Sequence, residues 1–123
     1  MPLRHHSLVA WQRADDLFIE VHRLSLSSFP DFERFELGSQ IRRAAYSVAA
    51  NIVEGCEREH KKEKLQFLAI SRASLAEVGY CLHVANRLGY IKNSRSEELD
   101  LSTRRVSAAL HGYIRAVRED RVR

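Results

Sequence analysis

The sequence predicts an all-α protein whose single domain, residues 1–123, is an antiparallel up-down-up-down four-helix bundle. Five Gly and two Pro in 123 residues leave few turns, so the elements should be few and long. Apolar residues recur three and four positions apart in four long stretches, which is the helical period, and no stretch alternates as a strand would. Short connections between such helices favour antiparallel neighbours. A chain of this length buries roughly two-thirds of its unfolded surface, enough for one core.

The first helix is predicted over residues 7–28. Ser7 is a plausible N-cap, and Phe29-Pro30 ends the helix because Pro cannot continue the hydrogen-bond ladder and restricts the residue before it. The face directed at the core contains Ala10, Ala14, Leu17, Val21 and Leu24. Residues 30–38, "PDFERFELG", form the longest connection. Because this segment has two Phe and a Leu, we expect it to pack onto the bundle.

The second helix is predicted over residues 39–58 and the third over 61–88. Their core-facing positions are Ile41, Ala44, Ala45, Val48, Ile52 and Gly55, then Leu68, Ser71, Leu75, Val78, Leu82 and Ala85. Gly89 suits the left-handed residue that ends many helices. The fourth helix is predicted over 95–119, with Ser94 as N-cap and Glu97 completing a capping box. Its apolar face contains Leu99, Val106, Leu110, Tyr113 and Val117.

The second helix also has a polar stripe. Gln40, Arg43, Ser47, Asn51, Glu54 and Arg58 occupy an arc of about 80°, with apolar residues beyond it: Tyr46, Ala49, Ala50 and Val53. The third helix has a second apolar side as well, made of Ile70, Ala73, Cys81, Val84 and Leu88, with Glu77 among them. Helices that are apolar nearly all round are usually buried. A small bundle cannot bury both sides of two helices, so we predict a homo-oligomer that uses these helices. The stripe, with Glu77, would be the polar seam where bundle and interface meet, and Arg43 and Glu54 could pair with neighbours such as Glu77.

The basic residues are the candidate nucleic-acid contacts. The net charge of +4 is a mild lean towards anionic partners. Candidates are Arg42, Arg58, Lys61, Lys62 and Lys64, taken as lying around the turn between the second and third helices, and Arg115 and Arg118 near the C-terminus, where Arg121 and Arg123 follow. The alternative is a solvated turn and a helix end whose cations complement the dipole. Readout of base edges is not expected, and stacking on bases would need exposed rings, for which Tyr46, Tyr80 and Tyr113 are the candidates.

Patterns typical of enzymes and metal sites are missing from the sequence. Glu54 and Glu77 lack the His three residues on that a di-iron bundle requires. The six His show no ligand spacing beyond the adjacent pair His5-His6. There is no glycine-rich phosphate loop and no Ser/His/Asp or Cys/His arrangement. Cys56 and Cys81 are expected to be buried small hydrophobes in a reducing compartment, rather than a disulfide. We therefore predict no cofactor, no metal and no catalysis.

Two segments of the sequence resemble a known family. The runs "ELGSQIRRAAYSVAANIVEGCER" and "KKEKLQFLAISRASLAEV", followed by "ANRLGYI", look like the bacterial four-helix-bundle family of 23S rRNA intervening-sequence proteins. Matching positions are Gln40, Arg42, Arg43, Ala44, Ser47, Asn51, Ile52, Glu54, Gly55, Arg58, Glu63, Phe67, Leu68, Ser74, Leu75 and Glu77. The chain departs from the family pattern at Gly38, Ala49 and His60, which are positions of local capping and helix straightness.

The resemblance implies a cytosolic bundle that assembles as a homopentamer and has no established catalytic activity. The family is also similar to the accessory protein of diversity-generating retroelements, a basic pentameric barrel that binds nucleic acid and a reverse transcriptase. Five copies at +4 each would sum to about +20 and repeat any basic patch around a ring.

These observations leave two main hypotheses for function. The first is a non-enzymatic homo-oligomeric bundle that binds structured RNA or DNA through backbone phosphates. The second is a protein-interaction or assembly module whose basic surface is incidental, and an enzyme is a third that only a bound metal ion would revive. We expect a cytoplasmic location, because residues 1–11 lack the apolar stretch of a secretory signal and no window of the sequence could span a membrane.

Overall fold

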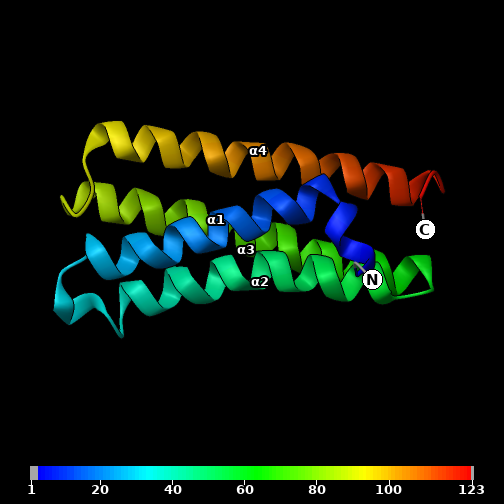
Figure 1. The fold of residues 1–123 in the computed structure, drawn as a ribbon, viewed down its shortest axis with the longest axis horizontal. Helices are drawn as coiled ribbons and strands as arrows, with labels where there is room; N and C mark the ends of the chain where they lie inside the picture. The colour runs from blue at the N-terminus through cyan, green and yellow to red at the C-terminus, as the bar shows by residue number, and fades with distance from the viewer. Residues whose placement is uncertain (1–2, 123) are drawn as a thin grey trace.

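The computed structural model describes residues 3–122, and within that range it contains four long α-helices, two short 3₁₀ turns and no strand (Figure 1). In chain order the elements are η1 (Arg4–Ser7), α1 (Val9–Ser27), η2 (Asp31–Glu33), α2 (Leu37–Glu57), α3 (Lys61–Arg87) and α4 (Asn93–Arg118). Each of the long helices lies within two residues of its predicted bounds. The predicted all-α fold with four helices is therefore confirmed.

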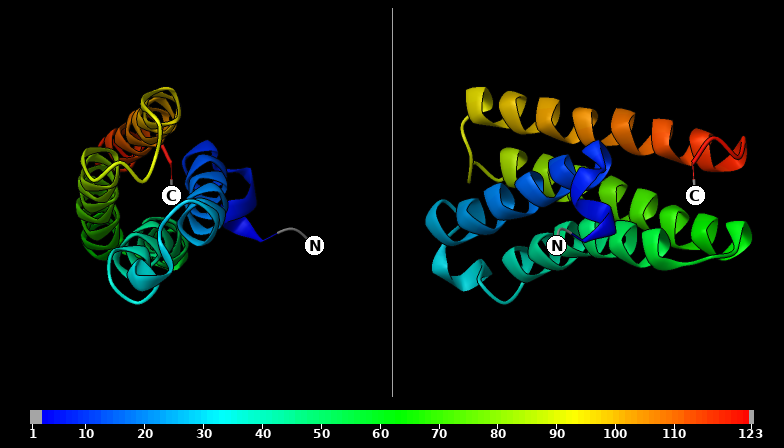
Figure 2. Two further views of the ribbon diagram at one scale, coloured as in Figure 1. Left: turned by 90° about the vertical axis from the view of Figure 1, so that its left-hand side faces the viewer. Right: turned by 45° about the vertical axis from the view of Figure 1, so that its right-hand side comes forward.

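The helices pack in the order of the chain, each antiparallel to the one before it. α2 contacts α1 and α3, and α4 closes the square by contacting α3 and α1 (Figure 2). The connections between α1 and α2 and between α3 and α4 lie at one end, which we call the loop end (Figure 1). The turn between α2 and α3, residues 58–60, lies at the other end with η1 and the end of α4 (Figure 1). We call this second end the turn end.

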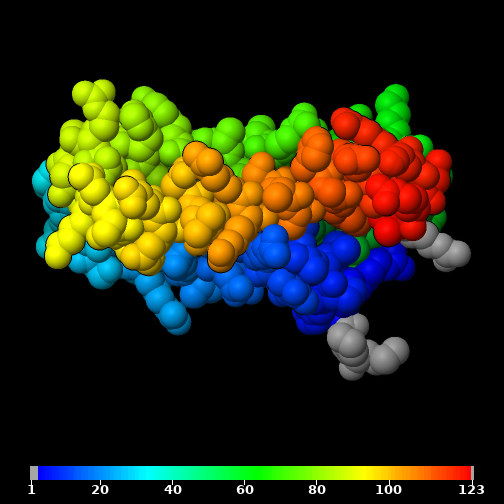
Figure 3. All heavy atoms as spheres, turned by 90° about the horizontal axis from the view of Figure 1, so that it is seen from above, coloured from blue at the N-terminus to red at the C-terminus, as the bar shows by residue number. Residues whose placement is uncertain are grey.

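One hydrophobic core runs the length of the bundle. All of the core-facing positions predicted for the four helices are buried, and the largest fully buried side chains include Val21, Ile41, Val48, Ile52, Leu68, Val78, Leu99, Val106 and Leu110. α4 lies along one long face, flanked by α1 and α3 (Figure 3). None of the helices described between residues 3 and 122 has the length and apolar character needed to cross a membrane.

The predicted caps at Ser7 and Ser94 are wrong. α1 begins two residues after Ser7, because the preceding residues form η1, which folds back so that His5 is buried against the ring of Trp11. α4 begins at Asn93, with Lys92 as its N-cap, and the side chain of Asn86 donates a hydrogen bond to Oδ1 of Asn93 (2.9 Å). In both places the helix begins without a side-chain cap from the predicted serine.

Gly89 ends α3 as predicted. Its φ of +80° is left-handed, a conformation that suits a residue without Cβ. The N–H of Gly89 donates to the carbonyl of Asn86 and that of Tyr90 to the carbonyl of Ala85, which is the Schellman pattern. Ile91 is buried behind this turn. The chain therefore leaves α3 with its last carbonyls satisfied and an apolar cover in place.

The connection at residues 30–38 differs from its prediction. Phe32 is 73% exposed and Phe35 is 81% exposed, so neither ring packs onto the bundle. Polar contacts hold the segment instead: Tyr90 donates to a carboxylate oxygen of Glu33 (2.7 Å), and Arg42 donates to the carbonyl of Arg34 (2.7 Å). Because the backbone is fixed by these bonds, its aromatic side chains are left in solvent.

Candidate anion-binding site

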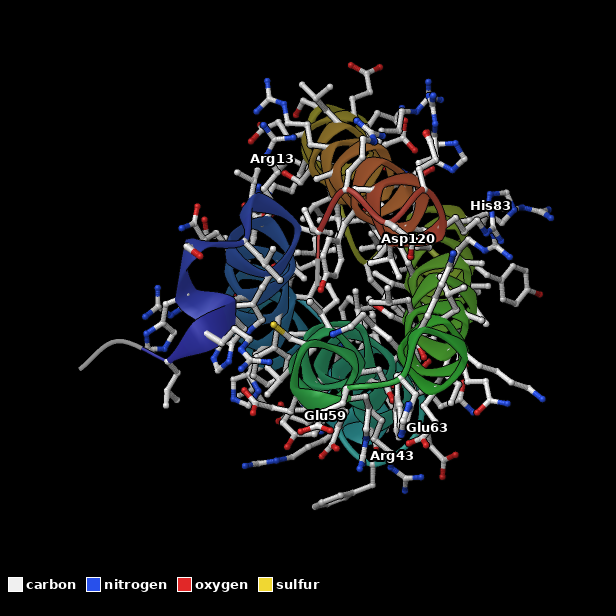
Figure 4. The ribbon with its side chains drawn as sticks, turned by 90° about the vertical axis from the view of Figure 1, so that its right-hand side faces the viewer. Arg13, Arg43, Glu59, Glu63, His83 and Asp120 are labelled. Atoms are coloured by element: carbon white, nitrogen blue, oxygen red, sulfur yellow. The ribbon has the colours of Figure 1, made fainter. Side chains whose placement is uncertain are left out.

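A cleft of about 640 Å³ opens at the turn end, where four segments meet (Figure 4). Arg4 comes from η1, Arg58 follows α2, Lys61 and Lys64 belong to the first turn of α3, and Arg121 follows α4. Two carboxylates, Glu59 and Asp120, also line the cleft, with Val117 and Val122. The lining therefore has five cations against two anions, and outside it Arg58 pairs with Glu54 (3.0 Å) and Arg121 with Glu119 (3.4 Å). The cleft is basic, although these carboxylates partly balance its arginines.

Lys64 lies at the base of this site and is 3% exposed. Its ammonium donates to the carbonyl oxygens of Gly55 (2.8 Å) and Cys56 (3.1 Å), the last turn of α2. Burial lowers the pKa of Lys64 from its usual 10.5, because the charged form loses water. The prediction of Lys64 as a solvent-facing phosphate contact therefore needs correction: it caps α2 and uses two of its three donors there.

Arg58 is held in place by neighbours on both helices. Its Nη2 pairs with Glu54 (3.0 Å), and its guanidinium lies 4.7 Å from the centre of the Phe67 ring. Nε of Arg58 is buried, and no hydrogen-bond partner for it exists among the described groups. The stacked guanidinium is a rigid, preorganised donor group at the mouth of the cleft.

The other predicted basic residues of this end are exposed. Lys61 forms an ion pair with Asp120 (3.2 Å), while Lys62 is turned to solvent beside the cleft. On α4, Arg115 lies 4.0 Å from Glu119, and Arg118 is exposed. Arg123 lies outside the described residues. Exposed pairs of this kind contribute little to folding, so their cations stay available to an anion.

Asp120 reaches Lys61 through an unusual backbone. Its φ of 57° is left-handed, which Asp tolerates better than most residues. The N–H of Asp120 donates to the carbonyl of Val117 and the N–H of Arg121 to that of Ala116, so the chain makes a Schellman turn at the end of α4. This turn places Asp120 (Figure 4) and Arg121 among the residues that line the cleft.

Arg42 does not belong to this cluster. It lies near the start of α2, sixteen residues before Arg58, which is about 24 Å along a helix at the usual rise per residue. Its guanidinium donates to Ser25 Oγ (2.9 Å) and to the carbonyl of Arg34. A Cβ added to Gly38 would lie only 2.9 Å from Nη1 of Arg42. Arg42 therefore ties α1 to α2 at the loop end, and its assignment to the turn is corrected.

The polar stripe of α2 is divided between two environments. Ser47 and Asn51 are half-buried in the seam with α3, where Ser47 Oγ lies 2.8 Å from Ser74 Oγ and Asn51 donates to Ser47 Oγ (3.0 Å). Gln40, Arg43, Glu54 and Glu77 are exposed, with Arg43 on the outer side of the bundle (Figure 4). Between residues 3 and 122, Glu77 forms no ion pair with Arg43, and Glu54 pairs with Arg58 instead, so the suggested pairing is wrong within one chain.

The second apolar side of α3 is partly open. Ile70 is 48% exposed, Leu88 is 55% exposed and Ala73 is also exposed, whereas Val84 is half-buried and Cys81 is buried. On α2, Tyr46 is exposed and Ala49 is buried. The single bundle therefore covers more of these sides than predicted. The apolar side chains that remain uncovered lie mainly on α3.

Two features of the surface were missed or misjudged from sequence. Tyr113 is buried and unavailable for stacking, whereas Phe32 and Phe35 are more exposed than Tyr46 or Tyr80. The cleft is also lined by Arg4, Asp120 and Arg121. Of these three residues, the sequence suggested only Arg121, through the cluster of arginines near the C-terminus. The contribution of Arg4 depends on η1 folding back to α2, which no local pattern announces.

Metal and thiol chemistry have no cluster to support them in the described residues. No three His, Cys, Asp or Glu side chains between residues 3 and 122 are grouped as metal ligands. Cys56 and Cys81 are free, and both are buried, as predicted for small hydrophobes. Burial, followed by the nearby Glu77 charge, raises the pKa of the Cys81 thiol, which disfavours the reactive thiolate.

Comparison with known proteins agrees with the fold. A protein of unknown function from the S23 ribosomal protein family of Bacteroides thetaiotaomicron has a crystal structure similar to this one, with a TM-score of 0.80, 21% identity, and coverage of 86% of this chain and 98% of that chain. At that identity the likeness concerns the fold. No curated protein matches the sequence. The family described as 23S rRNA-intervening sequence protein matches residues 6–112. Because the match spans most of the chain, the protein belongs to the 23S rRNA-intervening sequence protein family.

Proposed function

We propose that this protein is a non-enzymatic, homo-oligomeric bundle that binds structured RNA or DNA through backbone phosphates at its turn end. The observation that carries the proposal is the convergence of Arg4, Arg58, Lys61 and Arg121 on one cleft, with Lys62 exposed beside it. Such a group neutralises phosphates and releases their counterions whatever the base sequence.

Assembly would multiply this charge. The uncovered apolar residues of α3 and its C-cap, among them Ile70 and Leu88, are the surface that a second copy would bury. In a ring of five copies, as the resemblance implies, the whole assembly would have a net charge of about +20, and the basic turn end would be repeated five times. Each end would contact a phosphate group weakly, and the ring would bind by their sum. We place this assembly in the cytoplasm.

A salt titration tests the proposal. Binding of a fluorescent RNA hairpin is measured by anisotropy between about 50 and 200 mM salt, where a protein that neutralises three phosphates should show a slope near −2.7 in log K against log salt. Absence of binding at low salt, or a slope near zero, would remove the proposal.

A charge-reversal pair locates the binding surface. Lys61→Glu with Lys62→Glu should keep the fold, since both side chains are exposed, and should abolish hairpin binding. The matched control is Arg23→Glu with Arg72→Glu, which makes the same change in net charge at exposed positions of α1 and α3 away from the turn end. Equal losses in the two doubles would indicate a general charge effect and contradict a site at the turn end.

The second candidate is a protein-interaction or assembly module. The exposed rings of Phe32 and Phe35 at the loop end favour it, because large apolar side chains on a surface often mark contacts with other proteins. By the similarity to the accessory protein of diversity-generating retroelements, a reverse transcriptase is one such partner. Loss of partner binding on Phe35→Ser, with hairpin binding absent throughout, would favour this candidate over the first.

A further inference from the structure

The cleft at the turn end has the dimensions of a small-ligand site. Its volume of about 640 Å³ lies within the range of pockets that enclose a nucleotide-sized molecule. A phosphate in the middle of a duplex backbone can pair with the exposed cations around the cleft, as the proposed function requires, but it is presented on a convex surface and cannot enter the cleft. A phosphate at the end of a strand, or on a free nucleotide, projects and can enter.

The electrostatics of the cleft also favour a doubly charged group. A terminal phosphate monoester has close to two negative charges at neutral pH, whereas each backbone diester has one. The carbonyls at the end of α2 are covered by the ammonium of Lys64 and by Arg4, whose Nη1 lies 3.4 Å from the Cys56 carbonyl. The adjacent N-terminus of α3 has no side-chain cap, so its N–H groups add positive potential, which Glu63 in the same turn partly offsets. The carbonyls at the end of α2 are thus covered by cations, and the N–H groups at the start of α3 are uncapped.

Two residues that line the same space have donor groups to spare. Lys64, 97% buried, uses two of its three ammonium donors on the carbonyls of α2, which leaves one. Nε of Arg58 is buried without a partner among the described groups. Buried polar groups are nearly always hydrogen-bonded, so an unpaired donor beside a cleft indicates a missing acceptor.

An acceptor that is part of the chain already lies at the rim. The Asp120 carboxylate pairs with Lys61 at 3.2 Å, held there by the left-handed turn that ends α4. Both side chains are largely exposed, so the pair is weak and an incoming dianion can displace it. The Asp120 carboxylate therefore occupies a position beside Lys61 where an anion bound in the cleft would lie.

From these observations we infer that the cleft binds a phosphate monoester, either at a strand terminus or on a free nucleotide, in competition with the Asp120 carboxylate. The inference rests on the proposed function, since it specifies which phosphate the turn end selects. Contacts of Lys62 and of neighbouring protein chains with the nucleic-acid backbone would then add affinity, and the cleft would select a terminal or free phosphate over a backbone phosphate.

Calorimetry with inorganic pyrophosphate at low salt tests the cleft directly. Lys61→Gln should weaken pyrophosphate binding about tenfold, because it removes a charge-assisted hydrogen bond from the cleft wall. Lys62→Gln is the matched control: it makes the same charge change one residue on, outside the cleft, and should alter binding less than about twofold. Asp120→Asn should tighten binding about threefold by removing the competing carboxylate.

Oligonucleotides distinguish the source of the phosphate. A single strand with a 5′-phosphate should bind more tightly than the same strand with a 5′-hydroxyl if the terminus is the ligand, whereas a nucleoside monophosphate that binds as tightly as the phosphorylated strand would identify a free nucleotide. The inference is overturned if neither pyrophosphate nor a nucleoside monophosphate binds, or if Lys61→Gln and Lys62→Gln weaken pyrophosphate binding equally. If the inference is overturned but the hairpin still binds in a salt-dependent way, the proposed function stands. If pyrophosphate binds but the hairpin does not, the inference about the cleft stands and the proposed function fails.

Discussion

Nζ of Lys64 donates a hydrogen bond to the carbonyl oxygen of Gly55 at 2.8 Å, from the first turn of α3 to the last turn of α2. A second bond to the carbonyl of Cys56 completes the cap. These carbonyls are among the four that an α-helix leaves without helical partners at its C-terminus. A buried cation thus joins the two helices at the point where the chain reverses.

The first prediction concerns this cap. Lys64→Met keeps the length and apolar stem of the side chain but leaves the two carbonyls short of a donor, so it should lower the free energy of unfolding by about 2 kcal/mol. Urea unfolding measures the change. The control is Lys62→Met, since Lys62 is exposed and its replacement should alter stability by less than about 0.5 kcal/mol. Equal effects in the two variants would contradict a capping role for Lys64.

The second prediction concerns the close approach of α2 and α3. A Cβ on Gly55 would lie 3.2 Å from the carbonyl oxygen of Lys64 and 3.3 Å from Cβ of Phe67, neither of which can move freely. Gly55→Ala should therefore destabilise by about 1–2 kcal/mol, although Ala is the better helix former. Gly112→Ala, with nothing within 4 Å of its Cβ, should stabilise by about 0.5–1 kcal/mol. Thermal melts that shift in the same direction for both would show that the helix contact at Gly55 is looser than described.

The helices and their core faces could be predicted because their signal is local. The positions of Ile41, Val48 and Ile52 follow from a period of 3.6 residues, and burying them requires only that the helices pack together. The end of α3 at Gly89 was predictable for the same reason, since a left-handed turn depends on one residue. The core faces and the end of α3 could thus be predicted from short windows of sequence, whereas the caps predicted at Ser7 and Ser94 were wrong.

The cleft could not be predicted because its parts are distant in the chain. Arg4 and Asp120 are separated by almost the whole sequence and meet only when the bundle has formed. Charge alone cannot tell whether an ammonium faces water, as Lys62 does, or folds back onto a carbonyl, as Lys64 does. The same limit explains Arg42, whose structural contacts at the loop end are tertiary.

The third prediction is a pH dependence. Burial first, and then the neighbouring Cys56, raises the pKa of Tyr113 above its usual 10. The folded chain therefore keeps a proton that the unfolded chain releases above pH 10, so stability is full below that pH and falls as the pH rises through it. Tyr113→Phe should make the loss of stability above pH 10 less steep. In this variant the stability should still fall with pH from about pH 9, because the pKa of Cys81 is also raised in the folded chain.

The measurement for Tyr113 is urea unfolding at several pH values from about 7 to 11. At neutral pH the variant should be as stable as the natural chain or more stable by up to about 1 kcal/mol, because the buried hydroxyl has no hydrogen-bond partner among the described residues. A variant whose stability falls with pH as steeply as the natural chain would contradict the assignment to this phenol.

The fourth prediction separates folding from assembly at Glu54. Its carboxylate is 53% exposed and pairs with Arg58 at 3.0 Å one helical turn on. Surface pairs of this kind contribute about 0.3–0.5 kcal/mol, so Glu54→Ala should change the stability of a single chain by no more than that. If the residue belongs to the polar seam of an oligomer, the variant should instead lower the mass measured by light scattering. A large loss of stability with unchanged mass would contradict both statements.

The fifth prediction tests assembly itself. Ile70 on α3 is 48% exposed on the uncovered apolar side, and Leu101 on α4 is 50% exposed, so the two are matched in accessibility. Burying a full aliphatic side chain stabilises by about 1.5–3 kcal/mol, and a carboxylate in its place would have to lose water in an interface. Sedimentation at micromolar concentration should therefore give an oligomer for the natural chain and for Leu101→Asp, and a single folded chain for Ile70→Asp. Dissociation in both variants would move the interface away from α3, and a natural chain that sediments as a single bundle would remove the ring.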